Sequence, residues 1–341
     1  MWLWKILKTV PNMPNRNHIM LKNRIIHTSY VFLFFFLFHR VTSIAKEPFS
    51  KEIYHPVLHF AEDLAFSTVQ IKVELNNDNA TGTNTEYCMG TGFFFSFVLE
   101  DKTHIPVIVT NKHVVSGAKR GSFILTNTNN DGTPNTTSHI NVSLDSFESR
   151  WIVHPDSSID LAIMPIAPLI NEVLSKGFTP FFRTLYKSLI PTDEQLERLT
   201  TVEDIVMVGY PIGISDSYNN YPIFRKGITA THPANKYEGR DEFMIDAACF
   251  PGSSGSPVFI LDIGSYVDKR SGSPLWGDRF YFLGILYAGP QYTATGEIKI
   301  VTIPDRKSTL TQTYIPINLG NVIRSSKLID FENVLMQIAN K

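Results

Sequence analysis

Hydrophobic and polar residues alternate with a period of two over much of the chain. In residues 67–75, Val69, Ile71 and Val73 fall on one side of an extended backbone, and polar residues such as Lys72 fall on the other. A strand with one face in a core and one in water has this pattern, because successive side chains point to opposite faces. The segment is therefore predicted to be a half-buried antiparallel strand.

Further short segments rich in β-branched and aromatic residues follow, separated by turns rich in Asn, Gly, Asp and Pro. In the first half they are residues 92–99, 106–110, 122–126, 140–144, 151–153 and 161–166. In the second half they are residues 205–208, 223–229, 243–247, 257–261, 280–286, 298–303 and 314–317. Many short strands divided by turn residues predict an all-β fold of barrels or sandwiches.

Two segments have the spacing of helices instead. Thr192 is followed three residues later by Gln195, which is the pattern of a capping box at the start of a helix. Near the C-terminus the hydrophobic residues at helical spacing are Leu328, Phe331, Val334, Leu335 and Ile338. The chain is therefore predicted to contain a helical connector and a C-terminal helix.

These elements divide the chain into five parts. Residues 1–45 are predicted to be a signal peptide with an N-terminal extension. We expect a first β-domain over residues 46–170, a helical connector over 171–202, a second β-domain over 203–319 and a C-terminal helix over 320–341.

The composition is that of a globular protein without a dominant charge. Of the 341 residues, 43% are hydrophobic and 18% are charged, and 31 Lys and Arg against 32 Asp and Glu leave a net charge of −1. Nucleic-acid binding is therefore not expected. The two cysteines, Cys88 and Cys249, lie in no C-x-x-C pair and beside no histidines at zinc spacing, so we expect no metal and no cofactor.

The segment FPGSSGSPVF, residues 250–259, combines glycines and serines directly before an apolar strand. Acyl transfer by a serine needs a base, a carboxylate that orients the base, and donors for an oxyanion. Ser254 is the candidate nucleophile, His113 in PVIVTNKHVVSG the candidate base, and Asp160 in DSSIDLAIMPI the candidate carboxylate. Taken singly, each is more often a turn, surface or satisfied interior residue. Together, their order places the site in the cleft between the two β-domains.

These segments resemble the chymotrypsin-fold, or trypsin-like, serine peptidases, and most closely their bacterial high-temperature-requirement-type branch. The similar segments, in family order, are GTGFFF, TNKHVV, DLAIM, FRKGITA, MIDAACFPGSSGSPVF and FLGILYAG. The resemblance implies two six-stranded antiparallel β-barrels that hydrolyse peptide bonds through an acyl-enzyme intermediate. It also implies His113 as base, Asp160 as orienting acid, Ser254 as nucleophile, and the amides of Gly252 and Ser254 as oxyanion donors.

The resemblance further implies which residues contact the side chain that precedes the cleaved bond. They are Ala248, Cys249, Phe250 and Ile285. Because this set contains no acid, we expect a pocket for small or medium apolar side chains.

The chain departs from the family pattern at several places. Ser256 replaces the second glycine after the nucleophile, a change that we expect the loop to tolerate. Ser253 stands where the digestive enzymes carry an acid that pairs with a newly cut N-terminus, so activation by that route is not expected. No peptide-binding PDZ module is expected after the second β-domain. The two cysteines are expected to be too far apart for a disulfide.

Two other functions compete with an exported serine endopeptidase. A catalytically silent relative would keep the double barrel and use its cleft to bind a peptide or protein, although it would have no chemical need for all three triad residues. An esterase or lipase of the α/β-hydrolase class would need the chain order Ser, Asp, His and alternating strands and helices. The order found here excludes that class.

The N-terminus predicts export to the periplasm or the extracellular medium. Lys22 and Arg24 precede an apolar run over residues 30–38, and small residues up to Ala45 follow. The run is about half the ~20 apolar residues of a membrane span, so a lasting anchor is the less favoured interpretation. We expect N-terminal sequencing of the exported protein to begin at Lys46. A sequence that starts upstream of the apolar run would indicate an anchored form.

Overall fold

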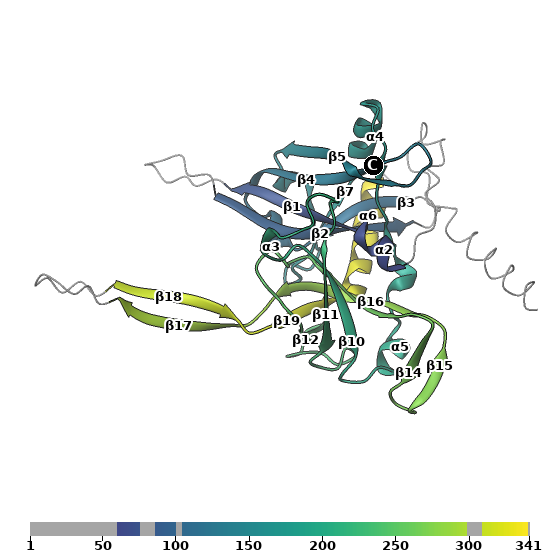
Figure 1. Cartoon of the computed structure of the whole chain (residues 1–341), viewed down its shortest axis with the longest axis vertical. Coiled ribbons are helices and arrows are strands. Elements are labelled where there is room, and N and C mark those ends of the chain that lie inside the picture. Colours follow the sequence, from purple (N-terminus) through teal and green to yellow (C-terminus); the bar gives the residue numbers. More distant parts are fainter. Residues whose placement is uncertain (1–59, 76–85, 100–103, 299–308, 340–341) are drawn as a thin grey trace, which may run out of the picture. The chain divides into compact units, whose positions relative to one another are not determined.

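The computed structural model describes residues 60–75, 86–99, 104–298 and 309–339 of the chain. The predicted signal peptide and Lys46 lie outside these residues. Antiparallel strands dominate the described part, with a few short helices between them (Figure 1). The all-β fold class predicted from the sequence is confirmed.

The N-terminal sheet has nine strands. Six are longer than two residues: β1 (Thr68–Leu75), β2 (Glu86–Val98), β3 (His104–Thr110), β4 (Ala118–Thr128), β5 (Pro134–Asp145) and β7 (Ala162–Pro165). Three have two residues each: β6 (Ile152–Val153), β8 (Pro180–Phe181) and β9 (Leu185–Tyr186). The order is β5-β4-β1-β2-β3-β7-β6, with β8 beside β4 and β9 beside β2. In β1 the predicted alternation holds, since Val69, Ile71 and Val73 are buried and Lys72 is exposed.

The second half forms a closed barrel of six strands. They are β10 (Asp204–Gly209), β11 (Ile223–Thr229), β12 (Glu242–Asp246), β13 (Pro257–Asp262), β16 (Arg279–Ala288) and β19 (Leu319–Arg324). Their order around the barrel is β10-β11-β12-β19-β16-β13. This is the six-stranded barrel that the resemblance implied for the second β-domain.

Two hairpins stand outside the barrel and are labelled in Figure 1. One pairs β14 (Ser265–Asp268) with β15 (Ser273–Trp276), and it was not predicted from the sequence. The other pairs β17 (Gln291–Ile298) with β18 (Thr309–Pro316). The strand predicted over 298–303 lies outside the described residues, except for its first residue.

The helices are short. The α-helices are α2 (Phe60–Ala65), α3 (Lys112–Val115), α4 (Ala167–Ser175), α5 (Asp193–Glu197) and α6 (Phe331–Ala339). The 3₁₀ turns are η1 (Glu148–Arg150), η2 (Lys187–Leu189), η3 (Pro211–Gly213) and η4 (Ser325–Asp330). The predicted capping box is present at α5, where the Gln195 amide donates to Thr192 Oγ1 at 3.2 Å and the Thr192 amide donates to Gln195 Oε1 at 2.8 Å.

The structure corrects the helical boundaries at two places. The connector expected over 171–202 also contains β8 and β9, because its backbone pairs with the edges of the N-terminal sheet. The helix expected from residue 320 begins only at Phe331, because residues 319–324 form β19 between β12 and β16 and close the barrel. Leu328, Phe331 and Leu335 are buried as the helical pattern predicted, whereas Ile338 is 52% exposed near the helix end.

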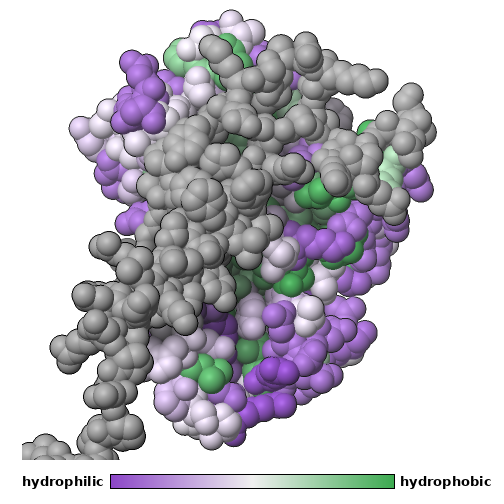
Figure 2. Space-filling model, turned by 90° about the vertical axis from the view of Figure 1, so that its right-hand side faces the viewer, coloured by the Kyte–Doolittle hydropathy of each residue, from purple (hydrophilic) through white to green (hydrophobic). Residues whose placement is uncertain are grey.

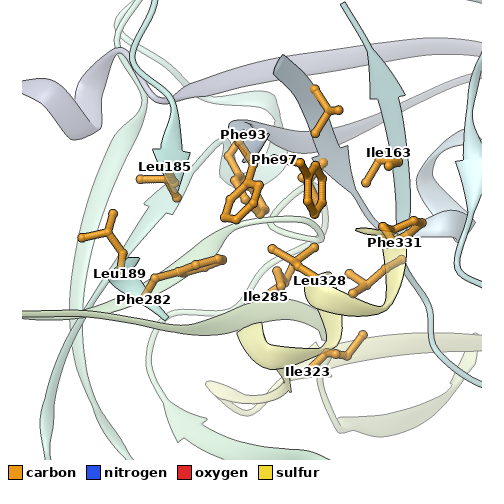
Figure 3. Packing of buried hydrophobic residues seen from close by; sticks show 14 of the residues in the cluster. Phe93, Phe97, Ile163, Leu185, Leu189, Phe282, Ile285, Ile323, Leu328 and Phe331 are labelled. Carbon is orange, nitrogen blue, oxygen red and sulfur yellow. The ribbon is translucent and has the colours of Figure 1, made fainter. Parts of the chain in front are cut away.

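One hydrophobic core joins the two halves of the chain. Figure 3 shows side chains from the N-terminal sheet, the connector, the barrel and the C-terminal turn and helix packed against one another. The labelled residues are Phe93, Phe97, Ile163, Leu185, Leu189, Phe282, Ile285, Ile323, Leu328 and Phe331. Because burial of each such side chain contributes about 1.5–3 kcal/mol, this core couples the folding of both sheets.

The surface in Figure 2 carries mainly hydrophilic residues, with small groups of hydrophobic residues between them. Such a mixture is typical of a surface in contact with water. Among the residues that the structure describes, no helix has the length and apolar character of a membrane span.

Candidate active site

His113 and Asp160 are brought together by the pairing of two strands. β3 pairs with β7 so that Thr110 lies opposite Ala162, and the residues just beyond these strand ends are therefore neighbours. His113 lies on α3, directly after β3, and Asp160 lies two residues before β7. The structure thus places two of the predicted site residues at one end of the N-terminal sheet.

Both carboxylate oxygens of Asp160 bind His113. The His113 amide donates to Oδ1 at 3.0 Å, and Nδ1 of the ring lies 2.5 Å from Oδ2. Because an ionised carboxylate only accepts hydrogen bonds, Nδ1 carries a hydrogen, and Nε2 of a neutral ring is left as an acceptor. The ring is 49% exposed and therefore open to a substrate.

The environment of Asp160 favours its ionised form. Burial opposes ionisation, but the hydrogen bonds and charge of His113, with a smaller effect from Lys112, outweigh it and lower the pKa of Asp160. Buried Asn111 holds the backbone in place, since its Nδ2 donates to the Asp160 carbonyl at 2.8 Å. Asp160 is therefore a fixed anion beside the imidazole.

Ser254 lies on a tight turn between β12 and β13, residues 250–256, here called the Ser254 turn. Gly252 and Gly255 have φ values of 83° and 89°, which glycine adopts without strain. A Cβ on Gly255 would lie 1.9 Å from the Thr91 carbonyl oxygen, so the close approach also requires glycine. The Ser254 hydroxyl donates to the Tyr287 carbonyl at 3.3 Å.

The amides of Gly252 and Ser254 donate no hydrogen bond to any residue that the structure describes. Their directions are nevertheless fixed, because an amide N–H points away from the carbonyl of the same peptide unit. The carbonyl of Pro251 accepts from the Ile212 amide at 2.6 Å, which orients the Gly252 amide. The carbonyl of Ser253 accepts from the Ser256 amide at 2.9 Å, which orients the Ser254 amide.

Ile212 supports this arrangement from a strained backbone. Its φ of 51° lies in the left-handed region, which is unusual for a β-branched residue and costs roughly 1–3 kcal/mol. The following residue, Gly213, has a φ of 71° and donates its amide to the Tyr210 carbonyl at 3.1 Å. The surrounding hydrogen bonds therefore hold Ile212 in the conformation that meets Pro251.

Thr91 of β2 joins the Ser254 turn to the N-terminal sheet. Its amide donates to the Ser254 carbonyl at 2.8 Å, and its hydroxyl donates to the Gly252 carbonyl at 3.0 Å. The same hydroxyl accepts from the Tyr210 amide at 3.1 Å, and Thr110 Oγ1 donates to the Thr91 carbonyl at 2.7 Å. Thr91 is fully buried, so these bonds are shielded from water.

The same strand contacts the helix that carries His113. Gly90, next to Thr91, faces Val114, since a Cβ on Gly90 would lie 2.4 Å from a methyl carbon of Val114. Adjacent residues of β2 therefore contact the neighbour of His113 on one side and Ser254 on the other. Strand β2 thus contacts both the helix of His113 and the turn of Ser254. Among the described residues no hydrogen bond joins His113 to Ser254, whose hydroxyl binds the Tyr287 carbonyl.

Ser256 fits the turn at the position where the resemblance implied a glycine. The φ of Ser256 is not positive. Its hydroxyl occupies the space that a side chain at residue 209 would need, since a Cβ added to Gly209 would lie 2.0 Å from Ser256 Oγ. The glycine of β10 thus provides the space that the serine needs.

The four residues predicted to form the substrate pocket differ in exposure. Phe250 is 37% exposed and Ala248 is partly buried. Ile285 packs in the core shared by both halves of the chain, and Cys249 packs in a separate hydrophobic cluster of the barrel, so their side chains face other core residues. Burial raises the pKa of the Cys249 thiol to about 11, an effect that Arg225 partly offsets. Within the described residues the two cysteines form no disulfide.

Sequence reasoning missed Arg225, whose side chain lies beneath the Ser254 turn. Its Nη1 donates to the Ala248 carbonyl at 2.8 Å and to Ser253 Oγ at 2.7 Å. The alternation in β11 was the available signal, because Phe224 and Lys226 are exposed and the arginine between them occupies the inward position.

No cluster of three or more possible metal ligands occurs among the residues described. The site consists of an imidazole held by a carboxylate, a hydroxyl on a rigid turn and two oriented amides that have no acceptor among the described residues. This set of groups is suited to acyl transfer.

Comparison with solved structures finds similar chains. A crystal structure of an inactive form of the Rv3671c protease shares 17% identity and a TM-score of 0.38, with 80% of this chain and 91% of that chain covered. An inactive serine-to-alanine mutant of Rv3671c from M. tuberculosis H37Rv shares 17% identity and a TM-score of 0.37, with coverage of 88% and 98%. No curated protein sequence matches the chain significantly.

The family comparison is more specific. The model of the trypsin-like peptidase domain matches residues 90–267, which is just over half of the chain and spans both halves of the site described above. The chain therefore belongs to the family of trypsin-like peptidases and is a serine protease of the chymotrypsin-like fold.

Proposed function

We propose that the protein is a serine endopeptidase that uses His113, Asp160 and Ser254 as a triad. We also propose that it is exported, because the sequence predicts a signal peptide. The observation that carries the triad is the double hydrogen bond of Asp160 to His113 on the same sheet whose Thr91 holds the Ser254 turn. This geometry supports the proposal that the base His113 and the nucleophile Ser254 are held in fixed positions relative to each other.

In the proposed reaction the Ser254 hydroxyl turns from the Tyr287 carbonyl toward the substrate. Its oxygen bonds to the scissile carbonyl carbon while its proton passes to Nε2 of His113. The carbon–nitrogen bond then breaks, and the leaving amine takes that proton. A water molecule then attacks the carbonyl carbon of the acyl-enzyme and passes a proton to Nε2 of His113. The bond to Ser254 Oγ breaks, Ser254 takes that proton, and the acid product is released. Asp160 stabilises the imidazolium in both halves of the reaction.

Charge that develops on the carbonyl oxygen is expected to be stabilised by the amides of Gly252 and Ser254. Both amides are oriented by hydrogen bonds on the far side of their peptide units. Because they need no reorganisation when charge develops, each donor contributes roughly 10²–10³-fold to the rate.

The pocket for the residue before the cleaved bond is proposed to lie at Ala248 and Phe250. A substrate cation there would approach the Arg225 guanidinium, which binds the Ala248 carbonyl. The four residues predicted to line the pocket include no acid that could pair with it. A small or medium apolar side chain would instead gain roughly 1–3 kcal/mol from burial.

We expect a fluorophosphonate probe to label Ser254 in the folded protein. Ser254→Ala should remove the labelling and reduce turnover by about 10⁴-fold or more, without loss of folding, because the hydroxyl is the attacking group. Peptide mapping of the labelled protein locates the adduct, and Ser175→Ala on the exposed end of α4 is the matched control. A folded protein without the label would instead favour a silent binding protein.

Asp160→Asn should lower kcat by roughly 10⁴-fold, because an amide at this position favours the wrong imidazole tautomer. Steady-state kinetics at neutral pH measure the loss, with Asp204→Asn at the exposed first residue of β10 as control. Equal activity of both variants would exclude Asp160 from the triad.

The same substitution has a predicted effect on stability. Because the pKa of folded Asp160 is lowered, its carboxylate stabilises the fold above the unfolded-state pKa of about 3.9, and this contribution is lost as pH falls through the folded-state value. In urea unfolding, Asp160→Asn should therefore be less stable than wild type at pH 7, by about 1 kcal/mol or more. The difference should shrink at about pH 3, and a constant difference would contradict the assignment.

In a mixed peptide library, we expect cleavage after Val, Ala, Ile or Leu and little cleavage after Arg or Lys. Mass spectrometry of the products identifies the residue before each cut, and Ser254→Ala controls for a contaminating protease. A dominant preference for Arg, Lys, Asp or Glu would refute the pocket while leaving the triad intact.

A further inference from the structure

Arg225 is a buried cation that has no charged partner among the described residues. Arg225 is 8% exposed, and its guanidinium forms no ion pair with any described carboxylate. Its acceptors among the described residues all belong to one short segment. They are the carbonyl of Ala248 and the hydroxyls of Ser253 and Ser256, the last at 3.4 Å. The Nε–H is buried and has no acceptor in the part of the chain that the structure describes.

The guanidinium remains charged at neutral pH. Burial lowers the pKa of Arg225, and the value of about 10 still lies well above 7. A buried charge costs free energy, and its replacement by an apolar side chain of similar size is often neutral or stabilising. Stability alone therefore does not explain an arginine at this position.

The hydrogen bonds of Arg225 tie together two parts of the segment around the nucleophile. Ala248 lies before the Ser254 turn, and Ser253 lies between the two amides that are proposed to bind the oxyanion. Thr91 holds the carbonyls of Gly252 and Ser254, so the turn is bound by both Thr91 and Arg225. Hydrogen bonds from a cation are about twice as strong as neutral ones.

We propose that Arg225 is a positioning residue that keeps the Ser254 turn in the conformation needed for transition-state binding. The inference rests on the proposed function of Ser254 as nucleophile. Arg225 does not touch the reacting atoms and acts through Ala248 and Ser253. Its loss is expected to let the Gly252 and Ser254 amides move out of alignment and so to slow the chemical step rather than substrate binding.

The test compares Arg225→Met, Arg225→Lys and Ser253→Ala with wild type. Lys226→Met is the matched control, because this lysine is the next residue of β11 and its side chain is 73% exposed. Fluorophosphonate titration counts the active sites, peptide hydrolysis gives kcat per titrated site and KM, and thermal unfolding reports folding.

For Arg225→Met we expect kcat per titrated site to fall by roughly 10- to 100-fold, as loss of hydrogen bonds from a charged donor implies, with KM changed much less. Arg225→Lys should recover part of the loss. Ser253→Ala should lower kcat by roughly 3- to 10-fold in wild type and have no further effect in Arg225→Met. Lys226→Met should behave as wild type.

A normal kcat per titrated site in Arg225→Met, even with fewer active sites, would overturn the inference, since Arg225 would then serve folding alone. If Arg225→Met does not fold, an unchanged kcat in Ser253→Ala overturns it. Wild-type protein without label at Ser254 would overturn the proposed function and this inference together, whereas labelled wild type with unaffected variants would overturn the inference alone.

Discussion

The site depends on the hydrogen bonds between Thr91 and the Ser254 turn. Thr91 belongs to the N-terminal sheet, whereas the turn joins two strands of the barrel, so these bonds bring together groups that are far apart in the sequence. Gly255 permits the close approach, because any side chain there would collide with the Thr91 carbonyl. These hydrogen bonds fix the Ser254 turn against the strand whose neighbouring residue contacts the helix of His113.

The shared core supports the same contact on a larger scale. Side chains of the N-terminal sheet pack against those of the barrel and of α6, as Figure 3 shows, so neither sheet can shift without loss of apolar burial. The rigid packing stabilises costly features at the site, namely the left-handed backbone of Ile212 and the buried charge of Arg225. Ile212 orients the Gly252 amide through the Pro251 carbonyl, and Arg225 binds Ser253, whose carbonyl belongs to the same peptide unit as the Ser254 amide.

The sequence predicted features that depend on local pattern. The alternation in β1, the capping box of Thr192 and Gln195 and the turn around Ser254 each follow from neighbouring residues. The family resemblance supplied the closed six-stranded barrel of the second half, whereas the described residues of the first half form a nine-stranded sheet. Strand β19 was mistaken for helix because its pairing with β12 and β16 is not visible locally. The left-handed conformation of Ile212 opposes its own propensity, and the partners of Arg225 lie more than twenty residues away.

The structure of the protein inhibited by a peptidyl phosphonate would test the account most directly. We predict a covalent bond between phosphorus and Ser254 Oγ, with the phosphonyl oxygen about 3 Å from the amide nitrogens of both Gly252 and Ser254. His113 should remain bound to Asp160 in that adduct. An adduct at another residue, or an oxygen directed away from both amides, would contradict the assignment of the site.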